Sequence, residues 1–200
     1  MPGLSGDGAR GAEPMLNVRQ QATVERLLDA GAEELRSVGL EGLTIRTVAL
    51  RAGVSAATAY TYFTSKDHLF AELFWRHLAH HPASDAARHG TGDADPVVRL
   101  TALVRELGAM LADSPEMAAA ATRALLGTDP AVERLRLRIG QEYLARFRVA
   151  LGPGVDTEVL DTLTLTYMGA LLQAGMGLLT YTETADRLVG AIEVVMSARR

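Results

Sequence analysis

The chain of 200 residues is long enough for one large domain or two small ones, and its 48% hydrophobic and 22% charged residues are typical of a globular protein. A formal net charge of −4 argues against a protein that coats nucleic acid non-specifically, because such binding needs many cationic contacts, but a local DNA-facing patch is still possible. Because the chain has no cysteine, a disulfide framework and a thiolate site are excluded, and the expected location is a reducing cytoplasm.

The N-terminal residues 1–17 are rich in Gly, Pro and small polar side chains, and they contain no apolar segment of the kind found in secretory signals. We therefore expect a disordered tail over 1–17. Residues 18–38 follow with apolar positions near the helical period, which predicts the first strong helix. Gly39 lies where a left-handed residue would end that helix.

Residues 44–63 have the pattern of two short helices around a tight turn. Ile45, Val48 and Ala49 recur at helical spacing and give the first helix, 44–51, one apolar face. Gly53 can adopt a positive φ at no steric cost, and Ser55 suits the N-cap of a second helix over 56–63. Two short helices about such a turn form a helix-turn-helix, so residues 18–64 are expected to be a three-helix DNA-binding domain.

Ser65 suits the N-cap of a linking helix over 65–81, and the composition of 82–95 predicts a loop at a domain junction. From Pro96 onward the pattern is helical, without strand alternation. The helices expected in this C-terminal bundle, residues 96–200, span about 96–113, 115–126, 130–151, 156–181 and 184–198. The predicted fold class is therefore all-α, with a helix-turn-helix domain followed by a larger helical bundle.

One uncharged segment, Thr162–Thr182, has about the length of a membrane span. Its five Thr, three Gly and one Gln interrupt the large apolar residues throughout. We therefore expect a helix buried on several faces rather than a transmembrane helix, and no membrane partner.

A helix-turn-helix reads DNA by placing the start of its second helix in the major groove while the preceding helix crosses the backbone. Small residues at that start allow close approach to bases, and the tyrosine hydroxyls that follow suit phosphate oxygens. The only lysine of the chain lies beside them, in the first turn of the next helix. The candidate DNA-contacting residues are Thr44, Arg46, Thr47, Ser55, Ala56, Ala57, Thr58, Tyr60, Tyr62 and Lys66. The alternative is that these are solvated residues around a small bundle, since the same shape occurs in proteins that bind no DNA.

From Arg19 to about Leu73 the chain resembles the DNA-binding domain of the TetR family of bacterial transcriptional regulators. The matching features are Gly39, Leu43-Thr44-Ile45-Arg46, Val48-Ala49, Ala52-Gly53-Val54-Ser55, Tyr60-Thr61-Tyr62-Phe63, Ser65-Lys66-Asp67 and Leu69. The resemblance implies that Thr44, Arg46, Tyr60, Tyr62 and Lys66 contact DNA and that residues 55–58 are placed for base contacts.

Two positions depart from this family pattern. Ala57 lies where the family often has Gly or Pro, and Ala59 lies where it usually has a larger aliphatic residue. Both alanines are good helix formers, so the second helix is expected to form.

The C-terminal half resembles the family only in its all-helical layout. This layout implies a small-molecule effector bound between the helices and a homodimer formed through the last two helices. Apolar residues from Tyr167 to Leu179 cover more than one face of a helix, as expected when one face meets its own core and another meets a partner subunit. The expected function is a repressor that binds a palindromic double-stranded DNA operator as a dimer and is relieved by the effector.

The effector is expected to be hydrophobic, because the candidate lining residues are mostly apolar. These candidates are Leu107, Met110, Met117, Tyr143, Phe147, Met168, Leu172 and Gln173, together with Leu103, Leu111, Leu125 and Thr164. Ordinary core packing is the alternative role for each of them.

Other functional classes have weaker support in the sequence. His77 and His81 have a spacing used by zinc sites, but they end a helix, where histidine also complements the helix dipole. No phosphate-binding loop, dinucleotide fingerprint, nucleophile elbow or paired acid and base is present, so we expect no catalytic residue, no cofactor and no metal. A helical protein-interaction module and an all-α enzyme are the remaining alternatives.

Overall fold

The computed structural model describes residues 17–81, 95–154 and 156–198. Helices occupy most of this part of the chain, which contains no strand, and the all-α prediction is confirmed. The helices are α1 (Val18–Gly42), α2 (Ile45–Arg51), α3 (Ala56–Tyr62), α4 (Lys66–His80), α6 (Pro96–Ala112), α7 (Pro115–Leu126), α8 (Pro130–Leu151), α9 (Thr157–Gly175) and α10 (Tyr181–Ser197). The tail expected over 1–17 and the loop expected over 82–95 lie outside the described residues, except for Asn17 and Asp95, which cap α1 and α6.

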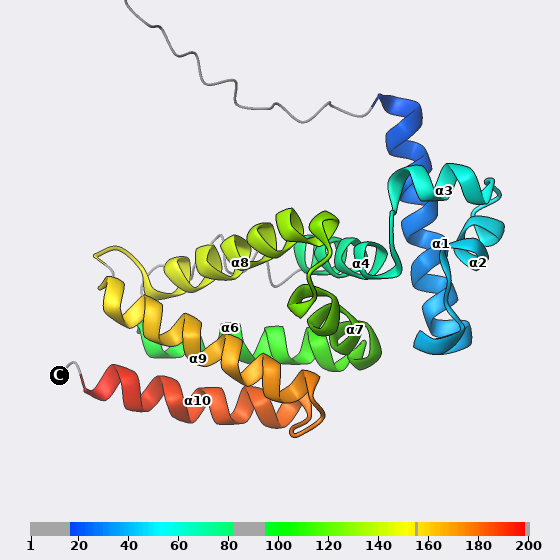
Figure 1. Cartoon of the computed structure of the whole chain (residues 1–200). Coiled ribbons are helices and arrows are strands. Elements are labelled where there is room, and N and C mark those ends of the chain that lie inside the picture. Colours follow the sequence, from blue (N-terminus) through cyan, green and yellow to red (C-terminus); the bar gives the residue numbers. More distant parts are fainter. Residues whose placement is uncertain (1–16, 82–94, 155, 199–200) are drawn as a thin grey trace, which may run out of the picture.

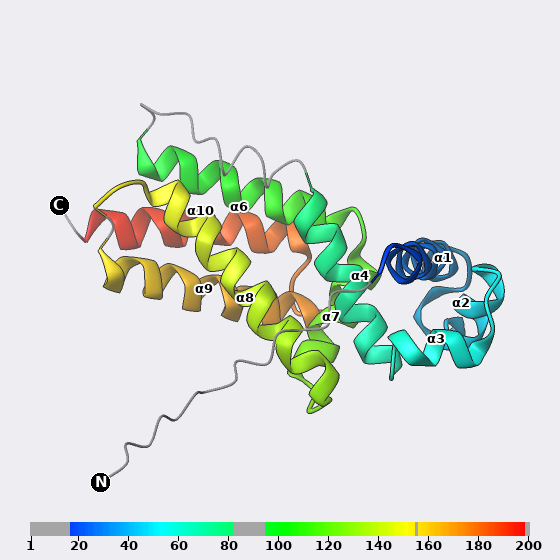
Figure 2. The same ribbon diagram turned by 90° about the horizontal axis from the view of Figure 1, so that it is seen from above.

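The two ends of the molecule have different architectures (Figure 1). Helices α1 to α3 form a small unit at one end, and α6 to α10 form a larger bundle at the other, with α4 running from the first to the second (Figures 1 and 2). Gly39 adopts a φ of 68°, as its predicted position required, but the helical segment resumes after this kink and continues to Gly42.

The small unit has its own core, to which the bundle contributes one helix. Leu27, Leu43 and Phe63 are buried there beside Leu69 and Phe70 of α4. Helix α7 adds Met117, Ala120 and Ala124 to the same cluster. The two parts of the chain therefore share apolar contacts through α4 and α7, so that a movement of either helix would be felt in both parts.

The end of α9 and the start of α10 differ from the predicted limits of 181 and 184. Helix α9 ends at Gly175, and Gly177 adopts a φ of 75° in the turn that follows. Helix α10 begins three residues earlier than predicted, because the Thr180 hydroxyl accepts from the Glu183 amide and Glu183 accepts from the Thr180 amide. This reciprocal capping box satisfies two amide donors at the helix start.

The uncharged segment is less buried than expected in the single chain. Leu165 is 74% exposed, Met176 59% and Leu178 66%. No helix in the described ranges combines the length and the apolar character needed to cross a membrane.

Candidate DNA interface and effector cavity

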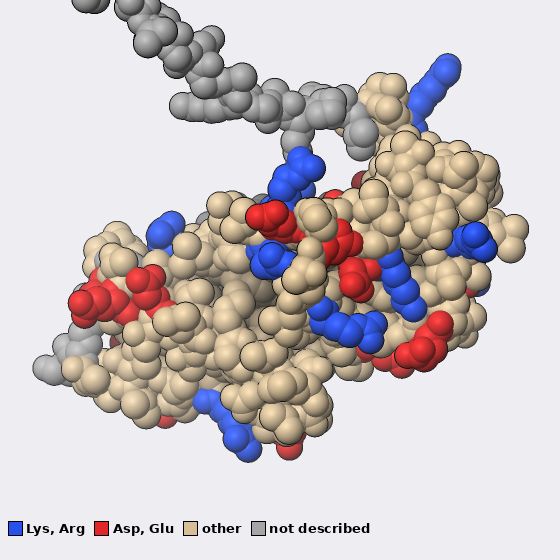
Figure 3. All heavy atoms as spheres, in the orientation of Figure 1, with Lys and Arg blue, Asp and Glu red and all other residues tan. Residues whose placement is uncertain are grey.

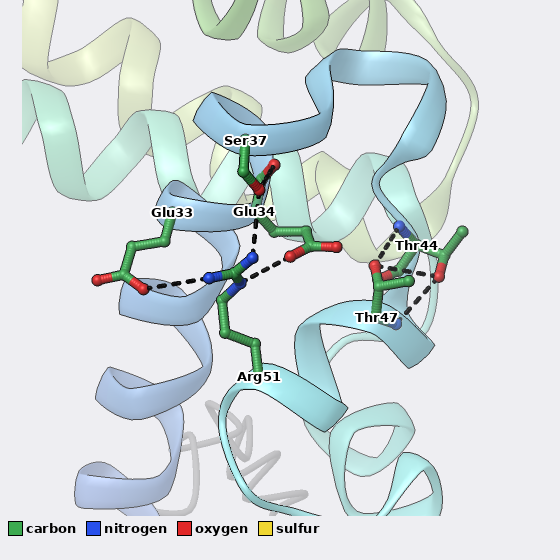
Figure 4. Close-up of polar contacts among 6 residues, drawn as sticks. All are labelled: Glu33, Glu34, Ser37, Thr44, Thr47 and Arg51. Carbon is green, nitrogen blue, oxygen red and sulfur yellow. Dashed lines mark hydrogen bonds and ion pairs between the residues drawn. The ribbon is translucent and has the colours of Figure 1, made fainter.

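The start of α2 is held by a capping box between two candidate DNA-contacting residues. The Thr44 hydroxyl accepts from the Thr47 amide at 3.1 Å, and the Thr47 hydroxyl oxygen accepts from the Thr44 amide at 3.0 Å (Figure 4). The Thr44 amide is therefore already used inside the protein. The amides of the first turn, including that of Arg46, have no intrahelical carbonyl partner and point out of the helix start, where an anion is favoured.

The start of α3 exposes small residues, as the sequence predicted. Ser55 is the N-cap, and its hydroxyl accepts from the Thr58 amide at 3.0 Å. Ala57 is exposed and Ala56 half-buried, while Tyr60 further along the helix is 45% exposed. Ala59, in place of a larger aliphatic residue, is fully buried against the small unit's core, so its small side chain fits the close approach of α3 to that core.

Lys66 and Tyr62 are more involved in internal packing than their predicted roles suggest. The Lys66 ammonium donates to the Leu40 carbonyl oxygen and lies 5.6 Å from the centre of the Phe70 ring. Tyr62 is half-buried and packs against the core of the small unit. Lys66 thus ties the start of α4 to the end of α1.

The orientation of α2 depends on Arg51, which the sequence analysis did not select. The Arg51 Nε lies 2.6 Å from the Glu34 carboxylate, and its Nη2 donates to the Ser37 hydroxyl at 3.2 Å (Figure 4). Glu33 is a weaker partner, 3.7 Å from Nη1. Glu34 is only 6% exposed. The signal for this pair was present in the sequence, because Glu34 lies three residues after Gly31, within the apolar stripe of α1.

The start of α4 is also joined to the start of α8. The Ser65 hydroxyl, which caps α4, donates to the carboxylate of Asp129, which caps α8. The Ser65 hydroxyl, followed by the Ala131 amide, holds the pKa of Asp129 below its ordinary value. Burial lowers the pKa of the neighbouring His68, and this effect outweighs the opposing attraction of Asp129. This junction connects the small unit of α1 to α3 (the DNA-reading unit) to the bundle through charge and hydrogen bonding.

A cavity of about 440 Å³ lies inside the bundle, where α4 and α6 to α10 meet. Phe74 contributes to its wall from α4. Of the predicted pocket residues, Tyr143, Met168, Leu172, Leu111 and Leu125 line it. Residues that the sequence analysis missed include Thr122 and Tyr181. The volume and the mostly aliphatic lining suit a small apolar ligand.

The other predicted pocket residues lie elsewhere. Leu107, Met110, Leu103 and Phe147 are buried in the bundle's core and do not line this cavity. Met117 packs in the core of the small unit, and Gln173 is exposed in a separate groove between α9 and α10. Thr164 donates its hydroxyl to the Leu160 carbonyl within α9.

The histidine-rich end of α4 has a mainly structural environment. The His77 and His81 rings meet edge to face at 6.0 Å, and the His77 Nε2 lies 3.3 Å from the Met110 carbonyl oxygen. The part of the chain that the structure describes contains no group of three or more His, Cys, Asp or Glu side chains placed to hold a metal ion.

Comparison with known proteins agrees with the helix-turn-helix fold. Residues 27–73 match the family of bacterial regulatory proteins called the tetR family. An uncharacterized HTH-type transcriptional regulator of Mycobacterium tuberculosis is 42% identical over 183 residues, which cover 90% of this chain and 84% of that protein. The transcriptional repressor KstR of Mycolicibacterium smegmatis is 30% identical over 139 residues, which cover 70% of this chain and 68% of KstR.

Solved structures share the fold at lower sequence identity. A TetR transcriptional regulator from Rhodococcus sp. RHA1 superposes with a TM-score of 0.69 at 20% identity, covering 88% of this chain and 97% of that one. Thermus thermophilus FadR, a TetR-family repressor solved with lauroyl-CoA, has a TM-score of 0.66 at 22% identity, covering 84% and 92%.

The fold and the exposed start of α3 define a helix-turn-helix protein that regulates transcription by binding DNA, and not an enzyme. The chain belongs to the TetR family of bacterial regulatory proteins.

Proposed function

We propose that this protein is a repressor that binds a palindromic operator as a homodimer in the cytoplasm and leaves it when a small hydrophobic effector enters the cavity. One observation carries the effector part of the proposal: Phe74 of the cavity wall lies on α4, whose first residue Lys66 bonds to Leu40 of the small unit and whose cap Ser65 bonds to Asp129 of the bundle. A ligand that displaces α4 therefore changes the positions of α2 and α3. Such a ligand must bind the two states of the protein with different affinity.

The related repressor FadR, which was solved with lauroyl-CoA, supports a ligand that contains an apolar chain. The test is a panel of lipophilic compounds that includes lauroyl-CoA, measured by the fluorescence of Trp75, which packs against the bundle's core on α4 beside Phe74. At least one compound is expected to change both the emission and the thermal midpoint, and to release an operator recovered by selection from random duplexes. If no compound of the panel changes any of these readouts, the effector proposal is contradicted.

The DNA contacts are proposed for the start of α2 and for α3. They comprise Thr44, Arg46 and Thr47, then Ser55 to Thr58 for the bases, and Tyr60, Tyr62 and Lys66 for the backbone. Arg46 and Tyr60 have the exposure that such contacts need. The Lys66 ammonium already donates to the Leu40 carbonyl oxygen. To contact a DNA phosphate, it would either keep this bond and donate a second one to the phosphate, or give up the Leu40 carbonyl.

Arg46→Ala is expected to weaken binding by a similar factor across operator variants and to reduce the slope of log affinity against log salt by about 1, because one phosphate contact is lost. Arg105→Ala is the matched control, since it removes the same charge from an exposed position on α6 in the bundle. Mobility-shift titrations at several salt concentrations measure both. Equal salt slopes of the operator affinity for the two variants would show that Arg46 does not contact a DNA phosphate.

The homodimer is proposed to form through α9 and α10. Leu165, Met176, Leu178 and Val194 are each more than half exposed on these helices and their connection. On the face drawn in Figure 3, most of the surface over these helices is uncharged, with acidic side chains gathered at the start of α9. Apolar, uncharged surface of this kind marks a protein interface. A monomeric mass in sedimentation at concentrations that bind the operator would contradict this arrangement.

Asp129→Ala is expected to weaken the link between effector and DNA, because it removes the partner of Ser65. Asp95→Ala is the matched control: both residues cap a helix that begins with proline, and only Asp129 bonds to α4's cap. Each variant should lose about 1 kcal/mol of stability from its lost cap. Only Asp129→Ala should reduce the change in operator affinity caused by a saturating compound from the panel. The same loss in both variants would show that Ser65–Asp129 transmits nothing.

A further inference from the structure

Four buried polar atoms of the bundle make no hydrogen bond of normal geometry among the described residues, although the Tyr143 and Tyr167 hydroxyls lie near each other and the Tyr181 hydroxyl lies near Thr122. They are the hydroxyl oxygens of Tyr143, Tyr167 and Tyr181 and the Nη1 of Arg146. Buried polar groups without partners are uncommon in folded proteins, and each one destabilises the native state. Their concentration in one bundle therefore indicates that something else supplies partners.

Two of the three tyrosines lie on the cavity. Tyr143 of α8 and Tyr181, the first residue of α10, both belong to its lining and are 1% and 6% exposed. Tyr167 of α9 packs against Tyr143 with ring centres 5.0 Å apart but does not line the cavity. Leu165, on the same lining, is 74% exposed, so the cavity opens on the leucine side and closes on the tyrosine side.

The closed end carries no uncompensated charge. Arg146, behind Tyr143, is 2% exposed, and its Nε donates to the Glu142 carboxylate at 2.9 Å while its Nη2 donates to the Leu78 carbonyl oxygen at 2.7 Å. Because this ion pair neutralises itself, the tyrosine end of the cavity offers no net positive charge to an anion. The cation that does line the cavity, Arg136 of α8, donates to the Leu125 and Gly127 carbonyl oxygens, both at 2.6 Å. Burial raises the pKa of Tyr143 and of Tyr181, so both hydroxyls remain protonated hydrogen-bond donors at neutral pH.

We propose that the closed end of the cavity binds an uncharged oxygen of the effector, a ketone, ester or hydroxyl oxygen, which accepts hydrogen bonds from Tyr143 and Tyr181. The aliphatic side chains around the rest of the cavity hold the apolar body of the ligand. A carbonyl oxygen has two lone pairs and can accept from both tyrosines at once. The proposal rests on the cavity being the effector site, and it adds the chemical class of the ligand's inner end.

Three matched probes, 2-decanone, n-decane and decanoate, separate the contributions to binding of an uncharged oxygen, of the apolar chain alone and of a negative charge. Binding is measured by Trp75 fluorescence and by the thermal midpoint of the full-length protein. 2-Decanone is expected to bind roughly tenfold more tightly than n-decane, because its oxygen meets two buried hydroxyls that make no hydrogen bond of normal geometry. Decanoate is expected to gain no further affinity from the tyrosines, because its charge would lose its hydration at a neutral site.

Tyr143→Phe and Tyr181→Phe are each expected to weaken 2-decanone binding by about fivefold while leaving n-decane binding unchanged. Tyr167→Phe is the control, because its hydroxyl is also buried but lies off the cavity. Without ligand, none of the three variants should lower the thermal midpoint, since each removes an unsatisfied hydroxyl.

The outcomes separate this inference from the proposed function. If no probe binds, the effector cavity is wrong and the inference falls with it. If the probes bind but 2-decanone and n-decane do so equally, or if the tyrosine variants leave the preference for the ketone intact, the inference alone is overturned. If decanoate binds most tightly and loses that affinity in Tyr143→Phe or Tyr181→Phe, the site takes an anion and the assignment of an uncharged oxygen is overturned.

Discussion

Arg51→Ala is expected to lower the free energy of unfolding by about 2 kcal/mol and to weaken operator binding in the same variant. The substitution removes the partner 2.6 Å from the Glu34 carboxylate, which is only 6% exposed and is then left buried without its cation. The estimate is below the range for a fully buried pair because the Arg51 side chain is 38% exposed. Operator binding falls because α2 loses its polar tie to α1.

The neighbouring acid provides the control for this prediction. Glu33→Ala removes a more exposed carboxylate at 3.7 Å and should change stability by less than about 0.5 kcal/mol. Glu34→Gln keeps the shape and removes the buried charge, so it should restore part of the stability when combined with Arg51→Ala. Urea unfolding at one protein concentration measures all four variants. Equal losses for Arg51→Ala and Glu33→Ala would show that Glu34 is not the important partner.

Gly108→Val is expected to destabilise the bundle by about 3 kcal/mol or more, because α6 and α10 approach too closely to admit a side chain. A Cβ at residue 108 would lie 2.6 Å from the Ala185 Cβ and 3.3 Å from the Tyr181 carbonyl oxygen. The helices must separate to accept it, and the start of α10 moves with them. Ligand binding should therefore also weaken, since Tyr181 lines the cavity.

A second glycine on a bundle helix tests whether the loss of stability comes from the close helix contact at Gly108 or from replacing any helical glycine. At Gly140 of α8, a Cβ would meet nothing within 4 Å. Gly140→Ala should leave stability unchanged or raise it by up to about 1 kcal/mol, because alanine is the better helix former. Denaturant unfolding gives the free energy of unfolding of both variants. A Gly108→Val variant as stable as the original chain would show that α6 and α10 can repack around a larger side chain.

Local structure was the most predictable part of this protein. Ser55 and Ser65 are confirmed as N-caps, accepting from amides three residues on, and Gly39 has the positive φ that its position required. The capping box of Thr180 and Glu183 is equally local but was overlooked, which moved the predicted start of α10 to 184. These features depend on side chains and amides within one helical turn, so the order of residues is enough to specify them.

Contacts between distant segments were not predictable in the same way. Ser65 and Asp129 are 64 positions apart and meet only because α4 passes the start of α8. Met117 was expected in the effector cavity but packs with the DNA-reading unit, because α7 contributes one face to that core. Helical periodicity shows that a face is apolar but does not say which neighbour covers it.

The sequence by itself determined the helix-turn-helix, the small residues at the start of α3 and the all-helical class, because caps, turn glycines and apolar spacing act within a few residues. Only the tertiary structure decided that Arg51 and Glu34 hold α2 to α1, that Lys66 bonds to Leu40, and that Tyr143 and Tyr181 line one cavity. These pairings depend on the angles at which whole helices pack. Those angles are set by the combined shape of many side chains and not by any short stretch of the chain.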